Sequence, residues 1–139
     1  MCRMVSVSVL VAVLAAGCSS SPTAPSTDVY SQTDIKVGTG TEATSASTVT
    51  VNYTGWFYDA SKTDKKGLQF DTSLGRAPYI VDLTAGGVIA GWVTGIPGMR
   101  VGGTRRLVIP PSLAYGANRY GPIPPNGTLV FDIDLLEVK

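Results

Sequence analysis

The stretch GWVTGIPGMRVGGTRRLVIPPSLAYG, Gly91–Gly116, is the most informative part of this 139-residue chain. It contains a single tryptophan, Trp92, together with several glycines, an Ile-Pro pair and a Leu-Ala-Tyr-Gly ending. Almost none of its side chains suits acid–base or nucleophilic chemistry. The stretch therefore predicts a preformed apolar cup with a few polar groups on its rim, which is the usual composition of a small-molecule site.

Segments on both sides of this stretch alternate between apolar and polar residues, which predicts strands buried on one face. Thr48–Tyr58 places Val49, Val51 and Tyr53 on one face, and Leu129–Val138 directs its apolar side chains inward. Shorter strands are expected at Asp34–Val37, Leu68–Asp71, Tyr79–Leu83 and Arg105–Ile109.

A short helix is expected at Val88–Val93, where Val88 and Trp92 share one face at i,i+4 spacing. We therefore expect an α+β domain in which a twisted sheet of about five antiparallel strands wraps around one short helix. A groove between the helix and the sheet would be a common place for a small ligand.

Composition excludes several kinds of site. The chain has no histidine, so histidine triads, histidine metal sites and histidine acid–base roles are excluded. Cys2 and Cys18 lie within or at the end of a predicted export signal, which leaves no cysteine for a disulfide or zinc site in the domain. Eleven Lys and Arg residues face ten Asp and Glu residues, and loss of Arg3 with the signal leaves ten of each. Such a balanced charge argues against nucleic acid as a partner, and no metal or cofactor is expected.

The N-terminal segment predicts export and lipid anchoring. Residues 1–17 combine a positive start with an apolar run too short for a transmembrane helix, and they end in small residues before Cys18. This ending resembles the bacterial lipobox, which implies lipid attachment at Cys18; an ordinary cleaved signal is the alternative. Residues 18–28 are interpreted as the lipidated cysteine and a flexible tether. Residues 29–139 are then one domain at the membrane of the cell envelope, facing the periplasm in a Gram-negative organism.

Two pairs of charged residues have simple structural interpretations. Asp132 and Asp134 alternate with apolar residues, so they are more simply the solvated face of the last strand than a pair of catalytic carboxylates. Arg105 and Arg106 would point to opposite faces of a strand, and two residues are too few for a nucleic-acid patch.

Five segments stand in a characteristic order. They are VNYTG (Val51–Gly55), QFDTS (Gln69–Ser73), VIAGW (Val88–Trp92), the Gly91–Gly116 stretch, and IPPNGTLVFDIDLLEV (Ile123–Val138). Together they resemble FKBP-type peptidyl-prolyl cis/trans isomerases over the chain from about Val29 onward. The resemblance implies an FKBP-like fold and an enzyme that isomerises X–Pro bonds to assist the folding of exported proteins.

The same resemblance implies a site assembled from residues far apart in the sequence. Its catalytic residues would be Tyr53, Asp71, Trp92 and Tyr115, and its substrate-binding residues would be Phe70, Arg76, Tyr79, Val88, Ile89, Ile123 and Phe131. Trp92 would form the floor beneath the proline ring. The Ile89 N–H and the Tyr115 hydroxyl would bind peptide carbonyls, and Asp71 would orient Tyr53 rather than act as an acid.

Partners follow from the same resemblance. Proline-containing polypeptides would be the substrates, and macrolides such as tacrolimus and rapamycin would be inhibitors. We expect the protein to be a monomer. A non-catalytic module that binds proline-containing segments, or a general chaperone, are the alternatives. The loop Asn118–Pro122 departs from the family pattern, because the family's frequent histidine is absent and Arg119 or Tyr120 stands nearby. We expect this loop and Ile123 to influence substrate preference.

Overall fold

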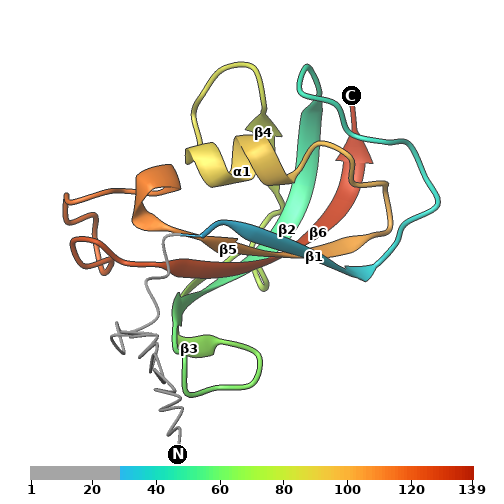
Figure 1. Cartoon of the computed structure of the whole chain (residues 1–139). Helices are drawn as coiled ribbons and strands as arrows, with labels where there is room; N and C mark the ends of the chain where they lie inside the picture. Colours follow the sequence, from blue (N-terminus) through green and yellow to red (C-terminus); the bar gives the residue numbers. More distant parts are fainter. Residues whose placement is uncertain (1–28) are drawn as a thin grey trace, which may run out of the picture.

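The computed structural model of the chain describes residues 29–139. The predicted signal peptide, the lipid-bearing Cys18 and the tether lie outside the described residues, so these three features stay predictions. The described part is built around one twisted sheet, with the helical segments on one side of it (Figure 1).

The sheet contains six strands within residues 29–139. They are β1 (Ser31–Lys36), β2 (Thr48–Tyr58), β3 (Lys66–Thr72), β4 (Tyr79–Asp82), β5 (Thr104–Ile109) and β6 (Leu129–Val138). The strand order is β1-β5-β6-β2-β3, with β4 also paired to β2, and every pairing is antiparallel. The predicted α+β class is confirmed, with six strands where about five were expected.

Strand β2 organises the sheet because it is long enough to pair with three other strands. Residues 48–51 pair with β4 and residues 54–58 pair with β3 along one edge, while β6 runs along the other edge. The predicted bounds of β2 and β6 are confirmed. By contrast, β1 begins at Ser31 rather than at the predicted Asp34. This edge strand is exposed along its whole length and is held by backbone pairing with β5, so it carries no alternation of burial.

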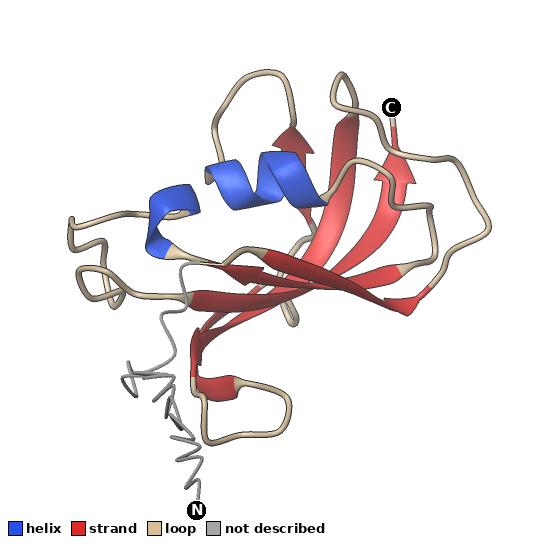
Figure 2. Ribbon diagram, in the orientation of Figure 1, coloured by secondary structure: helices blue, strands red, loops and turns tan. Residues whose placement is uncertain are grey.

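Two helical segments lie on the same side of the sheet (Figure 2). They are helix α1 (Ala90–Gly95) and the 3₁₀ turn η1 (Pro111–Leu113). The predicted helix Val88–Val93 is thus displaced by two residues, because Ile89 adopts an extended conformation with φ −61° and ψ 149° and only precedes the first turn. Within residues 29–139, no helix has the length and apolar character needed to cross a bilayer.

Helix α1 approaches β5 through two glycines. A Cβ atom placed on Gly91 would lie 2.5 Å from Cγ2 of Ile109, and one on Gly95 would lie 2.6 Å from Cδ2 of Leu107. Carbon atoms do not pack that closely, since their contacts are most favourable near 3.5–4.0 Å. Only a helix with glycine at both positions can therefore rest this close to the strand, and that position determines where Trp92 stands.

The core lies between α1 and the inner face of the sheet. Its side chains are 4% exposed or less and include Val49, Val51, Val81, Trp92, Ile96, Leu107, Ile109, Leu129, Phe131, Ile133 and Leu135. The inward direction predicted for the apolar residues of β6 is confirmed. Asp132 points outward as predicted, but the interpretation of a solvated face needs correction. Its side chain is only 20% exposed, because Arg106 and Lys66 cover and bind its carboxylate.

The neighbouring arginines of β5 point to opposite faces, as the sequence predicted. Arg106 binds Asp132 on the outer face. Arg105 is buried on the inner side, where its Nε donates to Asp34 Oδ1 at 2.6 Å and its Nη1 donates to the Gly95 carbonyl at 2.7 Å. Because Asp34 belongs to β1 and Gly95 ends α1, this one side chain joins three elements of the fold.

Candidate active site

A cavity of about 240 Å³ opens between α1, the inner face of the sheet and the loop that follows η1. Strands and loops contribute seven side chains to its lining, six of them aromatic and one a carboxylate. The other lining residues lie around the start of α1 and include Trp92. The lining residues are Tyr53, Phe70, Asp71, Tyr79, Gly87, Val88, Ile89, Trp92, Tyr115, Tyr120 and Phe131. Nine of the eleven residues predicted from the sequence are therefore brought together in one place.

The deepest side chains of the cavity are Trp92 and Phe131, each only 4% exposed. Their ring centroids are 5.3 Å apart with the planes at 90°, an edge-to-face geometry that aromatic quadrupoles favour. Trp92 comes from α1 and Phe131 from β6, so the same contact that closes the core also forms the bottom of the cavity. The indole Nε1–H of Trp92 is buried and has no hydrogen-bond partner within residues 29–139.

Tyr53 of β2, Phe70 of β3 and Tyr79 of β4 form the aromatic walls. The Tyr53 ring lies edge-on to Trp92 at 5.1 Å and to Tyr79 at 5.9 Å, and the Phe70 ring lies edge-on to Phe131 at 5.7 Å. A larger residue than glycine at position 55 would close this space. A Cβ atom on Gly55 would lie 2.7 Å from Cζ of Phe70 and 2.8 Å from Cε1 of Phe131.

A β-bulge explains why two consecutive residues of β3 both face the cavity. Gly55 pairs with Asp71, but the next residue of β2, Trp56, pairs with Gln69, so Phe70 is the extra residue of the bulge. In a regular strand, neighbours point to opposite faces and one of the two would be lost from the site. The bulge instead directs both Phe70 and Asp71 into the cavity.

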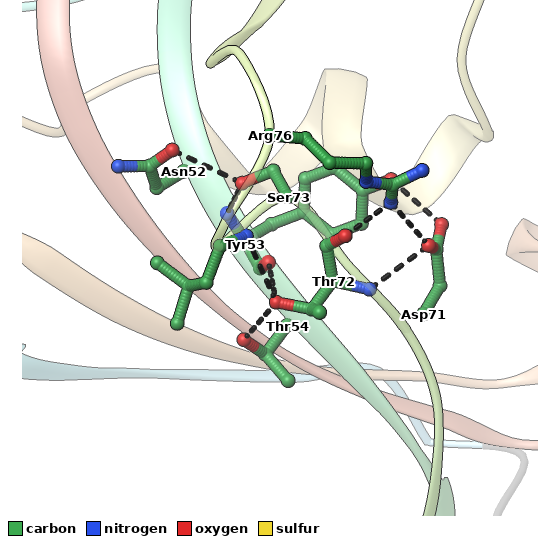
Figure 3. Close-up of polar contacts among 8 residues, drawn as sticks. Asn52, Tyr53, Thr54, Asp71, Thr72, Ser73 and Arg76 are labelled. Carbon is green, nitrogen blue, oxygen red and sulfur yellow. Dashed lines mark hydrogen bonds and ion pairs between the residues drawn. The ribbon is translucent and has the colours of Figure 1, made fainter.

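Asp71 connects the wall of the cavity to its charged rim (Figure 3). The Tyr53 hydroxyl donates to Asp71 Oδ2 at 2.6 Å, and Arg76 Nη2 donates to Asp71 Oδ1 at 2.8 Å. Arg76 also donates to the backbone carbonyl of Thr72. Burial of Tyr53, followed by its hydrogen bond to Asp71, raises the pKa of the phenol to about 12. Tyr53 is therefore a hydrogen-bond donor at every physiological pH.

A second set of polar contacts fastens the start of the β3–β4 connection to β2, as Figure 3 also shows. Ser73 Oγ accepts the backbone N–H of Tyr53 at 2.9 Å and donates to Asn52 Oδ1 at 3.1 Å. The hydroxyls of Thr54 and Thr72 lie 3.0 Å apart on the outer face. These contacts hold the backbone on both sides of the Tyr53–Asp71 pair, and the sequence analysis did not identify them.

Two predicted site residues lie outside the cavity. Arg76 stands on the rim, where its side chain is 63% exposed and paired with Asp71. Ile123 is 4% exposed and belongs to the core instead of the lining. Conversely, Gly87 and Tyr120 line the cavity although the sequence analysis did not assign them to the site. Tyr120 lies in the loop that departs from the family pattern, so that departure was the available signal.

The cavity offers apolar surface and few polar side chains. Asp71 is the cavity's acidic residue, and it is already engaged by Tyr53 and Arg76. Ile89 lines the cavity, and its N–H has no acceptor among residues 29–139. Within the same residues, no group of three or more His, Cys, Asp or Glu side chains is placed to hold a metal ion. The cavity can thus hold an apolar ring and donate hydrogen bonds at its rim.

Comparisons with known proteins give a consistent result. Residues 39–136 match the family model described as FKBP-type peptidyl-prolyl cis-trans isomerase. The FK506-binding protein of Neisseria meningitidis serogroup B is 43% identical over 107 residues, which are 76% of this chain and 92% of that protein. FK506-binding protein 4 of Neurospora crassa is 45% identical over 106 residues, and this chain spans only 21% of that protein's length. The crystal structure of FkpA from Escherichia coli superposes with a TM-score of 0.66 at 41% identity, covering 79% of this chain and 48% of that one.

Proposed function

The chain belongs to the FKBP-type peptidyl-prolyl cis-trans isomerase family, and from this premise we propose that its aromatic cavity speeds the rotation of X–Pro bonds in exported polypeptides. The observation that carries the proposal is the cavity itself. It has Trp92 and Phe131 at the bottom, Tyr53, Phe70 and Tyr79 around it, and a carboxylate, Asp71, that Tyr53 and Arg76 already engage. Such a lining suits selective binding.

Selective binding suits this reaction because rotation breaks no covalent bond. The planar amide is charge-separated, since the nitrogen lone pair is shared with the carbonyl, and rotation costs about 18–20 kcal/mol. In the twisted state the sharing is lost and the bond is less polar. An apolar cavity that excludes water accepts the twisted amide at lower cost than the planar one, so it binds the transition state better than the ground state.

Polar groups at the rim would orient the substrate. In this proposal the proline ring would lie over Trp92. The N–H of Ile89 and the hydroxyl of Tyr115, both from residues that line the cavity, would donate to the flanking carbonyls. Asp71 acts indirectly in this proposal, because it accepts from the Tyr53 hydroxyl and holds that ring against Trp92. Uncatalysed isomerisation takes tens to hundreds of seconds, which is slow enough to limit folding.

The chain has two tryptophans, which provide a matched test of this proposal. Trp92 forms the cavity floor. Trp56 lies on the outer face, where Nζ of Lys66 is 4.0 Å from the centroid of its ring. In a chymotrypsin-coupled assay with proline tetrapeptides, we expect Trp92→Leu to lower kcat/KM at least about tenfold. Trp56→Leu is expected to stay within about twofold of the unsubstituted chain. An equal loss in both variants would contradict the assignment of the cavity as the active site.

Macrolide binding is part of the same proposal. The relatives matched here are named for binding FK506, and the cavity presents this chain's Tyr53, Trp92 and Phe131 to an apolar ring. We expect tacrolimus and rapamycin to inhibit the isomerase activity in the same assay. Tight binding of a proline peptide without any rate increase would favour the alternative, a module that holds proline-containing segments. Suppression of aggregation without peptide selectivity would favour a general chaperone.

We also propose that the protein is exported and held to a membrane by lipid at Cys18, with residues 19–28 as a tether. The support is the sequence of residues 1–18. Growth with a clickable fatty acid should label the unsubstituted chain and a Cys2→Ser variant, and should leave Cys18→Ser unlabelled. A label that survives in Cys18→Ser would refute this anchor without affecting the proposal on catalysis.

A further inference from the structure

The rim of the cavity contains an aromatic pair with a geometry unlike the others. Tyr115 and Tyr120 are stacked with their ring centroids 4.4 Å apart and their planes within 6° of parallel. All the other ring pairs among residues 29–139 are edge-on or tilted. Tyr120 is 60% exposed, so its ring covers one face of Tyr115 from the solvent side while both rings line the cavity.

Tyr120 is held in this position by a connection to the core. Its N–H donates to the Ile123 carbonyl at 3.1 Å, and the Ile123 N–H donates back to the Tyr120 carbonyl at 2.8 Å. Gly121 completes the tight turn with φ +53°, a left-handed conformation that suits glycine. Because Ile123 is buried, the turn is anchored at its second end, and Tyr120 is held over Tyr115 although its own side chain is exposed.

Tyr115 needs such support because nothing else on the rim fixes its hydroxyl. The Tyr115 hydroxyl has no hydrogen-bond partner among residues 29–139, in contrast to Tyr53, whose hydroxyl is held by Asp71. A half-buried phenol without an acceptor can rotate about χ1 and χ2 unless packing limits it. The Tyr120 ring is the packing surface that lies against its face.

We propose that Tyr120 is a positioning residue for the isomerase reaction, acting through Tyr115. The Tyr120 ring restrains the Tyr115 ring, and through it the direction in which the Tyr115 hydroxyl donates to a bound peptide. The proposal rests on the proposed function, since it assigns Tyr120 a part in that reaction. It also gives the buried Ile123 a place in the site, as the anchor of the turn that carries Tyr120.

Kinetics of the full chain test this assignment. Tyr120→Phe keeps the stacked ring and should retain kcat/KM within about twofold, whereas Tyr120→Ala should lower it about fivefold. In a Tyr115→Phe background, where the hydroxyl to be positioned is absent, Tyr120→Ala should have less than about a twofold further effect. Leu68→Ala, an exposed residue of β3 away from the cavity, controls for loss of surface apolar area. A full fivefold loss in the Tyr115→Phe background would overturn the proposal, because Tyr120 would then act independently of that hydroxyl.

NMR with ring-labelled tyrosine tests the stacking of the two rings, on which the positioning depends, without relying on activity. The Tyr115 ring signals should carry a ring-current shift in the unsubstituted chain and in Tyr120→Phe, and lose it in Tyr120→Ala. Unchanged Tyr115 signals in Tyr120→Ala would overturn the proposal. If the unsubstituted chain isomerises no peptide while the shift behaves as expected, the proposed function fails and the catalytic part of this proposal fails with it. If the chain is active and the shift does not change, only the role of Tyr120 fails.

Discussion

The two faces of β6 carry opposite chemistry at adjacent residues, Phe131 and Asp132. Phe131 points inward, where it meets Trp92, Phe70 and Tyr53 through edge-on ring contacts. Asp132 points outward, where it accepts from Arg106 at 2.8 Å and from Lys66 at 2.6 Å. Lys66 in turn lies 4.0 Å from the centroid of the Trp56 ring.

The difference shows how the fold separates its two requirements. The outer network joins side chains of β5, β6, β2 and β3, so charge holds the strands together on the face away from the cavity. Around the cavity the inner face presents mainly aromatic rings, which would exclude water from the place where a peptide would rotate. We therefore expect substitutions on the inner face to change activity and stability, and those on the outer face to change stability alone.

The largest expected effect comes from Phe131→Ala. Removing a phenylalanine that is 4% exposed leaves a cavity in the core, so the free energy of unfolding should fall by about 3–5 kcal/mol. The isomerase activity should fall as well, because the cavity floor loses one of its two rings and Trp92 loses its edge-to-face partner. Urea denaturation and the peptide assay measure the two effects. A loss of stability with normal activity would break the proposed division between the two faces.

Asp132→Asn on the outer face should cost less and leave activity unchanged. The substitution removes the charge that binds Arg106 and Lys66, so we expect a loss of about 1–2 kcal/mol in the free energy of unfolding. Burial alone would raise the pKa of Asp132, but the hydrogen bonds from Arg106 and Lys66 lower it below its ordinary value of 3.8.

The direction of this pKa shift predicts a pH dependence. A carboxyl with a lowered folded pKa contributes its full stability above the unfolded value and loses it as the pH falls through the folded value. The difference in urea midpoint between the unsubstituted chain and Asp132→Asn should therefore be complete at neutral pH and shrink below about pH 4. A difference that grows on acidification would contradict the lowered pKa of Asp132 in the folded chain.

Asp71→Val tests the acidic residue that lines the cavity. The Tyr53 hydroxyl would lose its acceptor and Arg76 its partner, so the Tyr53 wall would be less well oriented. We expect kcat/KM to fall by about fivefold, without complete loss, because the apolar floor remains. Circular dichroism should confirm an intact fold. Complete loss of activity in a folded variant would indicate that Asp71 takes part in the chemistry directly.

The smallest expected effect is that of pH on the reaction itself. The chain has no histidine, and burial and the Asp71 hydrogen bond raise the pKa of Tyr53 to about 12. The pKa of Tyr115 is also raised, by burial and then by the proximity of Tyr120. Both phenols therefore keep their protons, and kcat/KM should vary by less than about twofold between pH 6 and pH 9. A bell-shaped profile in that range would contradict catalysis by selective binding.

Much of the fold could be predicted because burial imposes a period on the sequence. The alternation in residues 48–58 and 129–138 located β2 and β6 at their observed bounds. Strand β1 has no such period, since its pairing with β5 depends on backbone groups that every residue carries. Helix α1 begins two residues later than predicted. Its start depends on the extended backbone of Ile89, which the spacing of side chains does not reveal.

The site was predictable mainly through resemblance to a family, and the remaining features depend on contacts that no local pattern encodes. The bulge at Phe70 arises from the pairing of β2 with β3. The burial of Ile123 and the stacking of Tyr120 on Tyr115 arise from how one loop folds back on itself. Gly55 matters because two rings approach it from other strands, so its role appears only in three dimensions.

Gly91 and Gly95 control the depth of the cavity although neither lines it. Trp92 follows Gly91 in the chain, so the height of the indole above the sheet depends on how close α1 comes to β5. A methyl group at either position would push the helix outward by about 1 Å, because carbon contacts settle near 3.5–4.0 Å. The indole would rise with the helix, and the largest ligands would be excluded first. We therefore expect the size of the ligands that the cavity accepts to be adjustable at two positions outside its lining.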